Sequence, residues 1–150
     1  MNNLLNIQNL HLSIAGKTIC TELNWTVKPG QHWAVMGLNG VGKTTLFNTI
    51  AQLNRADSGK INMMDAPVDS YEPKQLAKKL GYLLQSLSYE FPQTVEEFCI
   101  NGLYPHINRW EMVSDKHKES IRQALKLTGL NGFEKRLIHT LSGGEKRRLE

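Results

Sequence analysis

One short pattern restricts the fold of this 150-residue chain more than any other feature. It consists of a glycine, four further residues and Gly-Lys-Thr, and it occupies residues 37–44. The run before it, residues 32–36, is short and largely apolar, which is typical of a strand buried in a parallel sheet. From Thr44 the apolar residues follow a helical period, which ends at residues 54–59. The order of strand, glycine loop and helix predicts an α/β fold.

The glycine loop at 37–44 has the groups that a phosphate-binding loop needs. Its glycines open backbone conformations that other residues avoid, so successive N–H groups can point at one anion. The positive end of the following helix adds to this attraction, Lys43 can reach the β- and γ-phosphates, and the Thr44 hydroxyl can ligate Mg²⁺. The predicted nucleotide-binding residues of this phosphate loop are Gly37, Leu38, Asn39, Gly40, Val41, Gly42, Lys43, Thr44 and Thr45.

A second glycine motif, Leu-Ser-Gly-Gly-Glu, occupies residues 141–145. A serine and two glycines directly before a charged helical stretch form a helix N-terminus that can bind an anion, with Ser142 and the N–H of Gly144 as donors. The motif follows the phosphate loop by about a hundred residues.

Together the two motifs resemble those of ABC-type ATPases, whose signature motif is the Leu-Ser-Gly-Gly-Glu string. The resemblance covers essentially the whole chain and implies an ATPase with ATP and Mg²⁺ as cofactors. It also implies a head-to-tail dimer, in which each phosphate loop faces the signature of a second copy. The signature residues that this places at the nucleotide are Ser142, Gly143, Gly144 and Glu145.

Gln85 is matched by the same resemblance to the Q-loop glutamine of these ATPases. In the family this glutamine contacts Mg²⁺ and the attacking water, and it lies where the membrane permease docks. The resemblance therefore implies Lys43 and Gln85 as catalytic residues, and Thr44 and Gln85 as metal ligands.

The fold that the resemblance implies is α/β: an incomplete ABC-type P-loop NTPase domain over residues 1–150. It has an N-terminal antiparallel β subdomain, a partial parallel sheet as core, and a helical subdomain at about residues 86–140. The hydrophobic pattern also predicts two antiparallel strands in the first part of the chain. Further elements predicted from the pattern are strands at 60–63 and 81–84 and a helix at 73–79.

Two more helices are predicted in the helical subdomain from their N-terminal residues. Thr94 with Glu97 three residues later is a capping box, and Ser114 or Asp115 can start a second helix. The apolar residues on one face of that second helix are Ile121, Ala124 and Leu125.

The segment from Phe91 to Trp110 resembles the helical subdomain of the ATPases of iron-chelate, haem and cobalamin importers. It contains Gly-x-x-Pro-His at residues 102–106, a pattern frequent at this place in that subgroup. The resemblance implies an ATP-binding subunit that couples ATP hydrolysis to import of a metal chelate through a membrane permease. Such a subunit is cytoplasmic and peripheral on the inner face of the cell membrane.

Two features depart from the family pattern. The aromatic residue that stacks on adenine in these ATPases is replaced by Ile14, and His11 is the nearest side chain that could substitute. The catalytic Asp, Glu and His that follow the signature in the family are absent, because the sequence stops at Glu150. We therefore expect nucleotide binding with little hydrolysis by this chain itself, and an exposed sheet edge that favours aggregation.

Composition and charge bear on the alternatives. The chain carries 18 Lys and Arg against 14 Asp and Glu, without a basic stripe with interleaved aromatic residues, so no nucleic-acid partner is expected. Cys20 and Cys99 lie far apart in sequence, which predicts reduced thiols. Neither a secretory leader nor an apolar run of ~18 residues is recognised. The alternatives are a soluble ABC ATPase acting on ribosomes or nucleic acid, and a non-catalytic truncated product.

Overall fold

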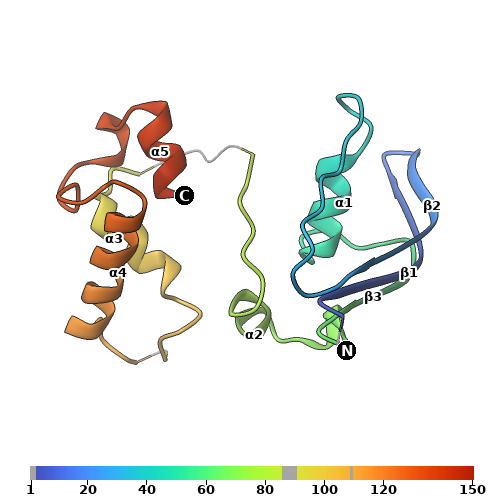
Figure 1. Ribbon diagram of the computed structural model, residues 1–150, viewed down its shortest axis with the longest axis horizontal. Helices are drawn as coiled ribbons and strands as arrows, with labels where there is room; N and C mark the ends of the chain where they lie inside the picture. Colours follow the sequence, from blue (N-terminus) through green and yellow to red (C-terminus); the bar gives the residue numbers. More distant parts are fainter. Residues whose placement is uncertain (1–2, 86–90, 109) are drawn as a thin grey trace. The chain divides into compact units, whose positions relative to one another are not determined.

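The computed structural model describes residues 3–85, 91–108 and 110–150. The chain divides into two compact units, Met1–Leu80 and Gly81–Glu150, and each unit has its own hydrophobic core (Figure 1). Of the helical subdomain predicted at about 86–140, residues 86–90 and 109 lie outside the described residues.

The first unit is built on an antiparallel hairpin of β1 (Leu5–Ile14) and β2 (Lys17–Val27), which confirms the two antiparallel strands predicted there. Ile7 and Leu10 of β1 are both buried, although they lie three positions apart and the side chains of a regular strand return to the same face every two positions. The register shifts between them, and Asn9 has a positive φ of 47°. This bulge turns Ile7 and Leu10 to the same core.

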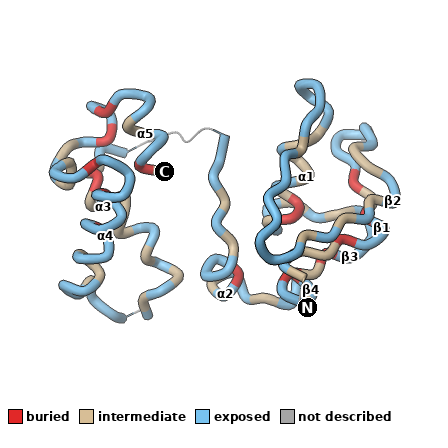
Figure 2. Tube along the Cα trace, viewed as in Figure 1, coloured by how far each residue is buried: buried red, intermediate tan, exposed pale blue. Residues whose placement is uncertain are grey.

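Two shorter strands complete the sheet, β3 (Ser58–Met63) and β4 (Ala66–Pro67). The strand order is β2-β1-β3-β4, and all neighbouring pairs are antiparallel. β3 confirms the strand predicted at 60–63. Figure 2 shows buried positions along β1 and β3. The buried core of this unit consists of Ile7, Leu10, Ile50, Ile61, Met63, Val68 and Leu76.

Short helices pack with this sheet. α1 (Lys43–Ile50) follows the phosphate loop, and α2 (Pro73–Ala77) begins with the proline that predicted it. A 3-10 helix, η1 (Val68–Ser70), precedes α2. Ile50 of α1 is buried whereas Phe47 is exposed, so the core of this unit covers only part of the apolar face predicted for this helix.

The strands predicted at 32–36 and 81–84 are wrong for this structure, because neither segment forms a strand. Met36 is 89% exposed and Leu83 is 51% exposed. A strand buried in a parallel sheet needs neighbours that pair with its backbone and cover both of its faces. The described residues contain antiparallel pairs and no parallel pair, so these two apolar runs lack such neighbours.

The second unit is helical over its described residues. Its elements are α3 (Val95–Gly102), α4 (Asp115–Leu127), a 3-10 helix η2 (Ile138–Thr140) and α5 (Gly143–Leu149). Thr94 and Ser114 are the N-caps of α3 and α4, which confirms both predicted helix starts. Ile121 and Leu125 of α4 are buried as predicted, while Ala124 is exposed.

The core of the second unit is formed by residues from every one of these elements and the loops between them. It consists of Val95, Ile121, Leu125, Leu130, Ile138, Leu141 and Leu149. None of the helices in the described part of the chain has the length and hydrophobicity that crossing a bilayer requires.

Candidate nucleotide-binding site

The N-terminus of α1 is suited to an anion. Gly42 is the N-cap residue and offers no side chain to accept a hydrogen bond, and the first turn of α1 contains no acidic residue. The first N–H groups of a helix have no acceptor within the helix, and they carry the positive end of its dipole. The side chains of α1 leave this positive charge uncompensated, which favours a phosphate group there.

Two glycines give the phosphate loop (37–44) its backbone path. Gly40 has a φ of +74° and Gly42 a φ of +107°, a region that favours glycine. A Cβ on Gly42 would lie 2.4 Å from Cγ2 and 2.6 Å from Cδ1 of Ile19, a residue of β2. β2 therefore packs directly against the loop backbone. Around Gly40 the space is open, so only the backbone conformation requires glycine there.

Two lysines bind the carbonyl groups of the phosphate loop. The Lys43 Nζ donates to the carbonyl oxygens of Gly37 at 2.7 Å and Leu38 at 2.8 Å. The Lys17 Nζ, at the start of β2, donates to the carbonyl oxygen of Gly40 at 2.9 Å. Because a trans peptide points its C=O and N–H in opposite directions, these bonds also fix the directions of loop N–H groups.

The remaining predicted residues of the loop are accessible. Leu38 is 85% exposed and Val41 is 46% exposed, and Asn39 and Thr44 are exposed as well. Thr45 is half-buried, and its carbonyl oxygen accepts a hydrogen bond from the Thr49 hydroxyl at 2.9 Å. The first unit thus brings all of the predicted phosphate-loop residues into one loop and one helical turn.

The signature residues lie at the start of α5 in the second unit, and Ser142 is its N-cap. The Ser142 N–H donates to Glu145 Oε2 at 2.6 Å, and the Glu145 N–H donates to Ser142 Oγ at 3.3 Å. The first of these bonds is the main reason why the pKa of Glu145 lies below its usual range. The N-terminus of α5 therefore carries its own carboxylate, whereas that of α1 carries none.

Gln85 is exposed and belongs to the second unit, as do the signature residues. Arg147 of α5 donates from Nη1 to the carbonyl oxygen of Leu84 at 2.8 Å, so the residue before Gln85 is held by the signature helix. Lys43 and Thr44 belong to the first unit.

β1 carries both residues that bear on the predicted adenine contact, Ile14 at the position of the missing aromatic residue and His11 as the side chain that could substitute. Ile14 is 48% exposed and pairs with Lys17 across the turn at residues 15–16. His11 is half-buried and pairs with Ser58 of β3. The hairpin tip therefore presents an exposed apolar side chain opposite a lysine.

The two cysteines are free, as predicted, and both are half-buried. Burial raises the pKa of the Cys20 and Cys99 thiols, so both stay protonated near neutral pH. No group of three or more His, Cys, Asp or Glu side chains within the described residues is arranged to hold a metal ion.

Lys17 and Ile19 contact the phosphate loop, yet the sequence did not identify them. They lie more than twenty residues before Gly40 and Gly42, and the hairpin register alone brings them to the loop. The only available signal was their position directly after the Gly16 turn. That signal locates a turn and does not predict a partner.

Comparison with known proteins identifies the family. Residues 20–150 match the family model described as ABC transporter, so the chain belongs to the ABC transporter family. Among its relatives is the petrobactin import ATP-binding protein of Bacillus anthracis, 32% identical over 99% of this chain and 54% of that protein. The hemin import ATP-binding protein of Rhizobium leguminosarum is 33% identical over 98% of this chain and 54% of that protein. The chain thus spans about half the length of the curated relatives it matches.

A solved structure has the same fold. It is described as a metal-chelate type ABC transporter in an inward-facing conformation, and its TM-score with this chain is 0.80 at 27% identity. The match covers 99% of this chain and 54% of that one. This likeness confirms the predicted ABC-type ATPase fold. The two relatives named above are import ATP-binding proteins, and their names do not favour a ribosome-associated ATPase.

Proposed function

We propose that this chain is the nucleotide-binding part of an ATP-binding subunit of a metal-chelate importer of the iron-siderophore, haem or cobalamin type. The subunit couples ATP binding and hydrolysis to import. The observation that supports this proposal is the phosphate loop, which brings together two positive-φ glycines, the Lys43 ammonium and an N-terminus of α1 without an acidic residue in its first turn. The two relatives named above are import ATP-binding proteins, which supports a function in import.

ATP with Mg²⁺ fits the residues of this site. Lys43 supplies a positive charge for the β- and γ-phosphates, and the N–H groups of α1 supply donors that need no rearrangement of the helix. The exposed Thr44 hydroxyl offers an oxygen atom, the ligand type that Mg²⁺ prefers. The bound ion would neutralise phosphate charge.

The partners in this proposal are a second copy of the subunit and an integral membrane permease. Ser142, Gly143 and Gly144 are exposed at the N-terminus of α5, where they can contact the nucleotide of a second, head-to-tail copy. The subunit would then be cytoplasmic and bound peripherally to the inner face of the membrane through its permease.

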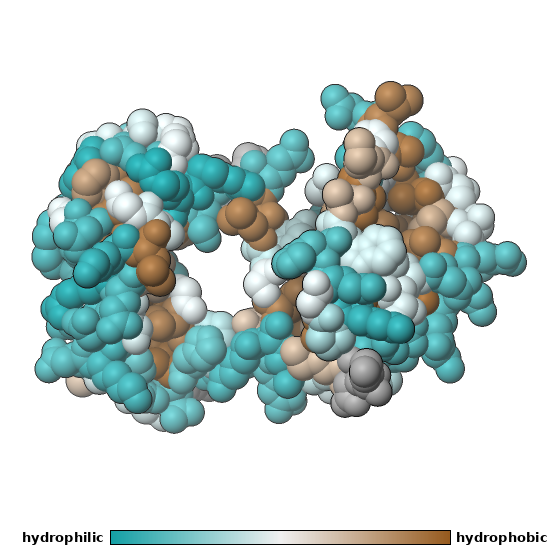
Figure 3. Space-filling view, viewed as in Figure 1, coloured by the Kyte–Doolittle hydropathy of each residue, from teal (hydrophilic) through white to brown (hydrophobic). Residues whose placement is uncertain are grey.

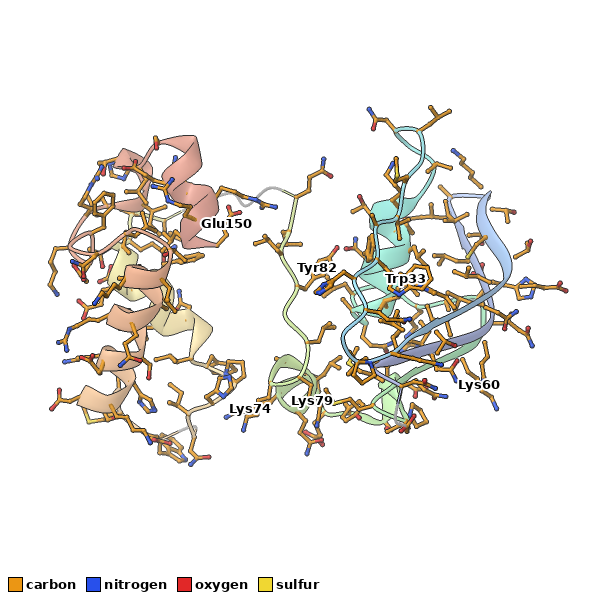
Figure 4. All side chains as sticks on the ribbon, viewed as in Figure 1. Trp33, Lys60, Lys74, Lys79, Tyr82 and Glu150 are labelled. Carbon is orange, nitrogen blue, oxygen red and sulfur yellow. The ribbon has the colours of Figure 1, made fainter. Side chains whose placement is uncertain are left out.

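The test is isothermal titration of Mg-ATP into the chain and into its Lys43→Ala variant. We expect binding by the natural sequence and a loss of affinity of at least roughly tenfold in the variant, because charge-assisted bonds to phosphate disappear. Lys60→Ala is the matched control, since Lys60 is exposed on β3 and projects from the sheet (Figure 4). Equal affinities of all three proteins, or no binding by the natural sequence, would contradict the proposal.

A further inference from the structure

The tip of the β1–β2 hairpin lies against the phosphate loop. Lys17 is the first residue of β2, and its ammonium donates to the Gly40 carbonyl oxygen at 2.9 Å across 23 residues of chain. Gly40 is the middle glycine of the loop and has a φ of +74°. The hairpin therefore holds the loop at the peptide unit between Gly40 and Val41.

A second residue of β2, Ile19, also contacts the phosphate loop. The β1–β2 register shifts between the pairs Leu12–Cys20 and Ser13–Thr18, which leaves Ile19 without a partner residue on β1. Ile19 packs so closely on Gly42 that a Cβ there would approach its side chain to 2.4 Å. Two side chains of β2, Lys17 and Ile19, thus reach Gly40 and Gly42 of the loop.

The Lys17 bond fixes the direction of one peptide unit. The Gly40 carbonyl belongs to the same planar unit as the Val41 N–H, and the two groups point in opposite directions. Lys17 therefore holds this peptide unit from the carbonyl side, while the Val41 N–H donates to the Leu38 carbonyl oxygen at 3.4 Å within the loop. Lys43 holds the peptides that follow Gly37 and Leu38 in the same way. An ammonium is a strong donor, so the carbonyl stays in place without any contact from the ligand.

We propose that Lys17 is a positioning residue for polyphosphate binding, which acts through the Gly40 carbonyl and not on the nucleobase. This inference rests on the proposed function. The hairpin tip carries Ile14 where the family stacks an aromatic ring on adenine, so its contribution to ligand binding passes through the loop. Removal of Lys17 then lowers the binding affinities for ATP, GTP and inorganic tripolyphosphate by the same factor.

The test compares Lys17→Met with Lys17→Arg, whose guanidinium can still donate to the carbonyl. We expect Lys17→Met to lose roughly threefold to tenfold in affinity for Mg-ATP and for tripolyphosphate alike, and Lys17→Arg to recover most of it. Lys60→Met removes the same charge from β3 of the same sheet and should bind like the natural sequence. Full affinity in Lys17→Met, or a loss confined to ATP, overturns the proposal.

Hydrogen exchange of the ligand-free proteins separates this inference from the proposed function. The N–H groups of residues 40–43 should exchange faster in Lys17→Met and return to the natural rate in Lys17→Arg. Unchanged exchange in Lys17→Met contradicts the positioning role, whatever the protein binds. Faster exchange in a chain that binds neither ATP nor tripolyphosphate would support the contact and reject the nucleotide site.

Discussion

Gly42 joins the phosphate loop to α1, and two separate requirements exclude a side chain there. Its φ of +107° strains any other residue, and Ile19 occupies the space that a Cβ would need. Ile19 is β-branched and stiff at χ1, so it cannot turn aside easily. At Gly40 only the positive φ excludes a side chain, because no atom lies within 4 Å of the position of a Cβ.

This difference predicts the relative effects of two alanine substitutions on the ligand-free protein. Gly42→Ala should lower the free energy of unfolding by about 2–4 kcal/mol, because backbone strain and overpacking add, whereas Gly40→Ala should cost about 1–2 kcal/mol from strain alone. Urea unfolding followed by tryptophan fluorescence measures both values.

Ile19→Ala provides the internal check on this prediction. In the Ile19→Ala background the steric part of the Gly42→Ala effect should disappear, leaving a cost close to that of Gly40→Ala. If Gly42→Ala and Gly40→Ala are equally destabilising in the natural sequence, the close packing of β2 on the loop is not energetically significant.

Residues of the site could be predicted where the residues that act together are close in sequence. Lys43 and Thr44 follow from a fixed spacing, because one loop and one helical turn bring them together. Lys17 and Ile19 could not be predicted, because their partners depend on how the hairpin folds back on the loop.

The helices of the second unit show that the residues at a helix N-terminus predict where the helix begins. α3 and α5 both begin with a capping box, formed by Thr94 with Glu97 and by Ser142 with Glu145. In each box the carboxylate accepts a hydrogen bond from the backbone N–H of the N-cap residue, at 2.7 Å and 2.6 Å respectively. These bonds hold the pKa of both glutamates below the usual range.

The lowered pKa values predict an acid transition in these two helices. The folded carboxylates release their protons at lower pH than those of the unfolded chain, so their stabilisation is complete above about pH 4.3 and declines as the pH falls through the folded pKa values. Far-ultraviolet circular dichroism should show loss of helix in that acidic range. Glu97→Gln, which keeps a capping side chain without a titrating group, should shrink the change. An identical acid profile in this variant would contradict the assignment.

Strands were predicted less well than helices, for a physical reason. A capping box needs only residues that are close in sequence, whereas a strand needs a neighbour that can be far away. β1 and β2 supply each other across the turn at residues 15–16. The runs at 32–36 and 81–84 have strand-like composition but no pairing partner among the described residues, and so they remain extended loops.

The molecule as a whole carries apolar side chains on its surface where those unpaired runs lie. Trp33 is 57% exposed and rests edge-on against Trp25 with 5.6 Å between ring centroids, and Met36 is 89% exposed. Figure 3 shows hydrophobic side chains on the visible surface of the first unit, over the phosphate loop and α1. Exposed patches of this kind favour association.

We propose that the phosphate loop and the N-terminus of α1 bind the polyphosphate of Mg-ATP. Nitrogen–proton correlation spectra of the chain during a Mg-ATP titration report on each loop amide separately and so locate the bound phosphates. We predict that the largest shifts occur at Gly40, Gly42, Lys43 and Thr44, and that they vanish in Lys43→Ala. Shifts concentrated elsewhere, for example at the basic residues 146–148, or no shifts at all, would contradict the account.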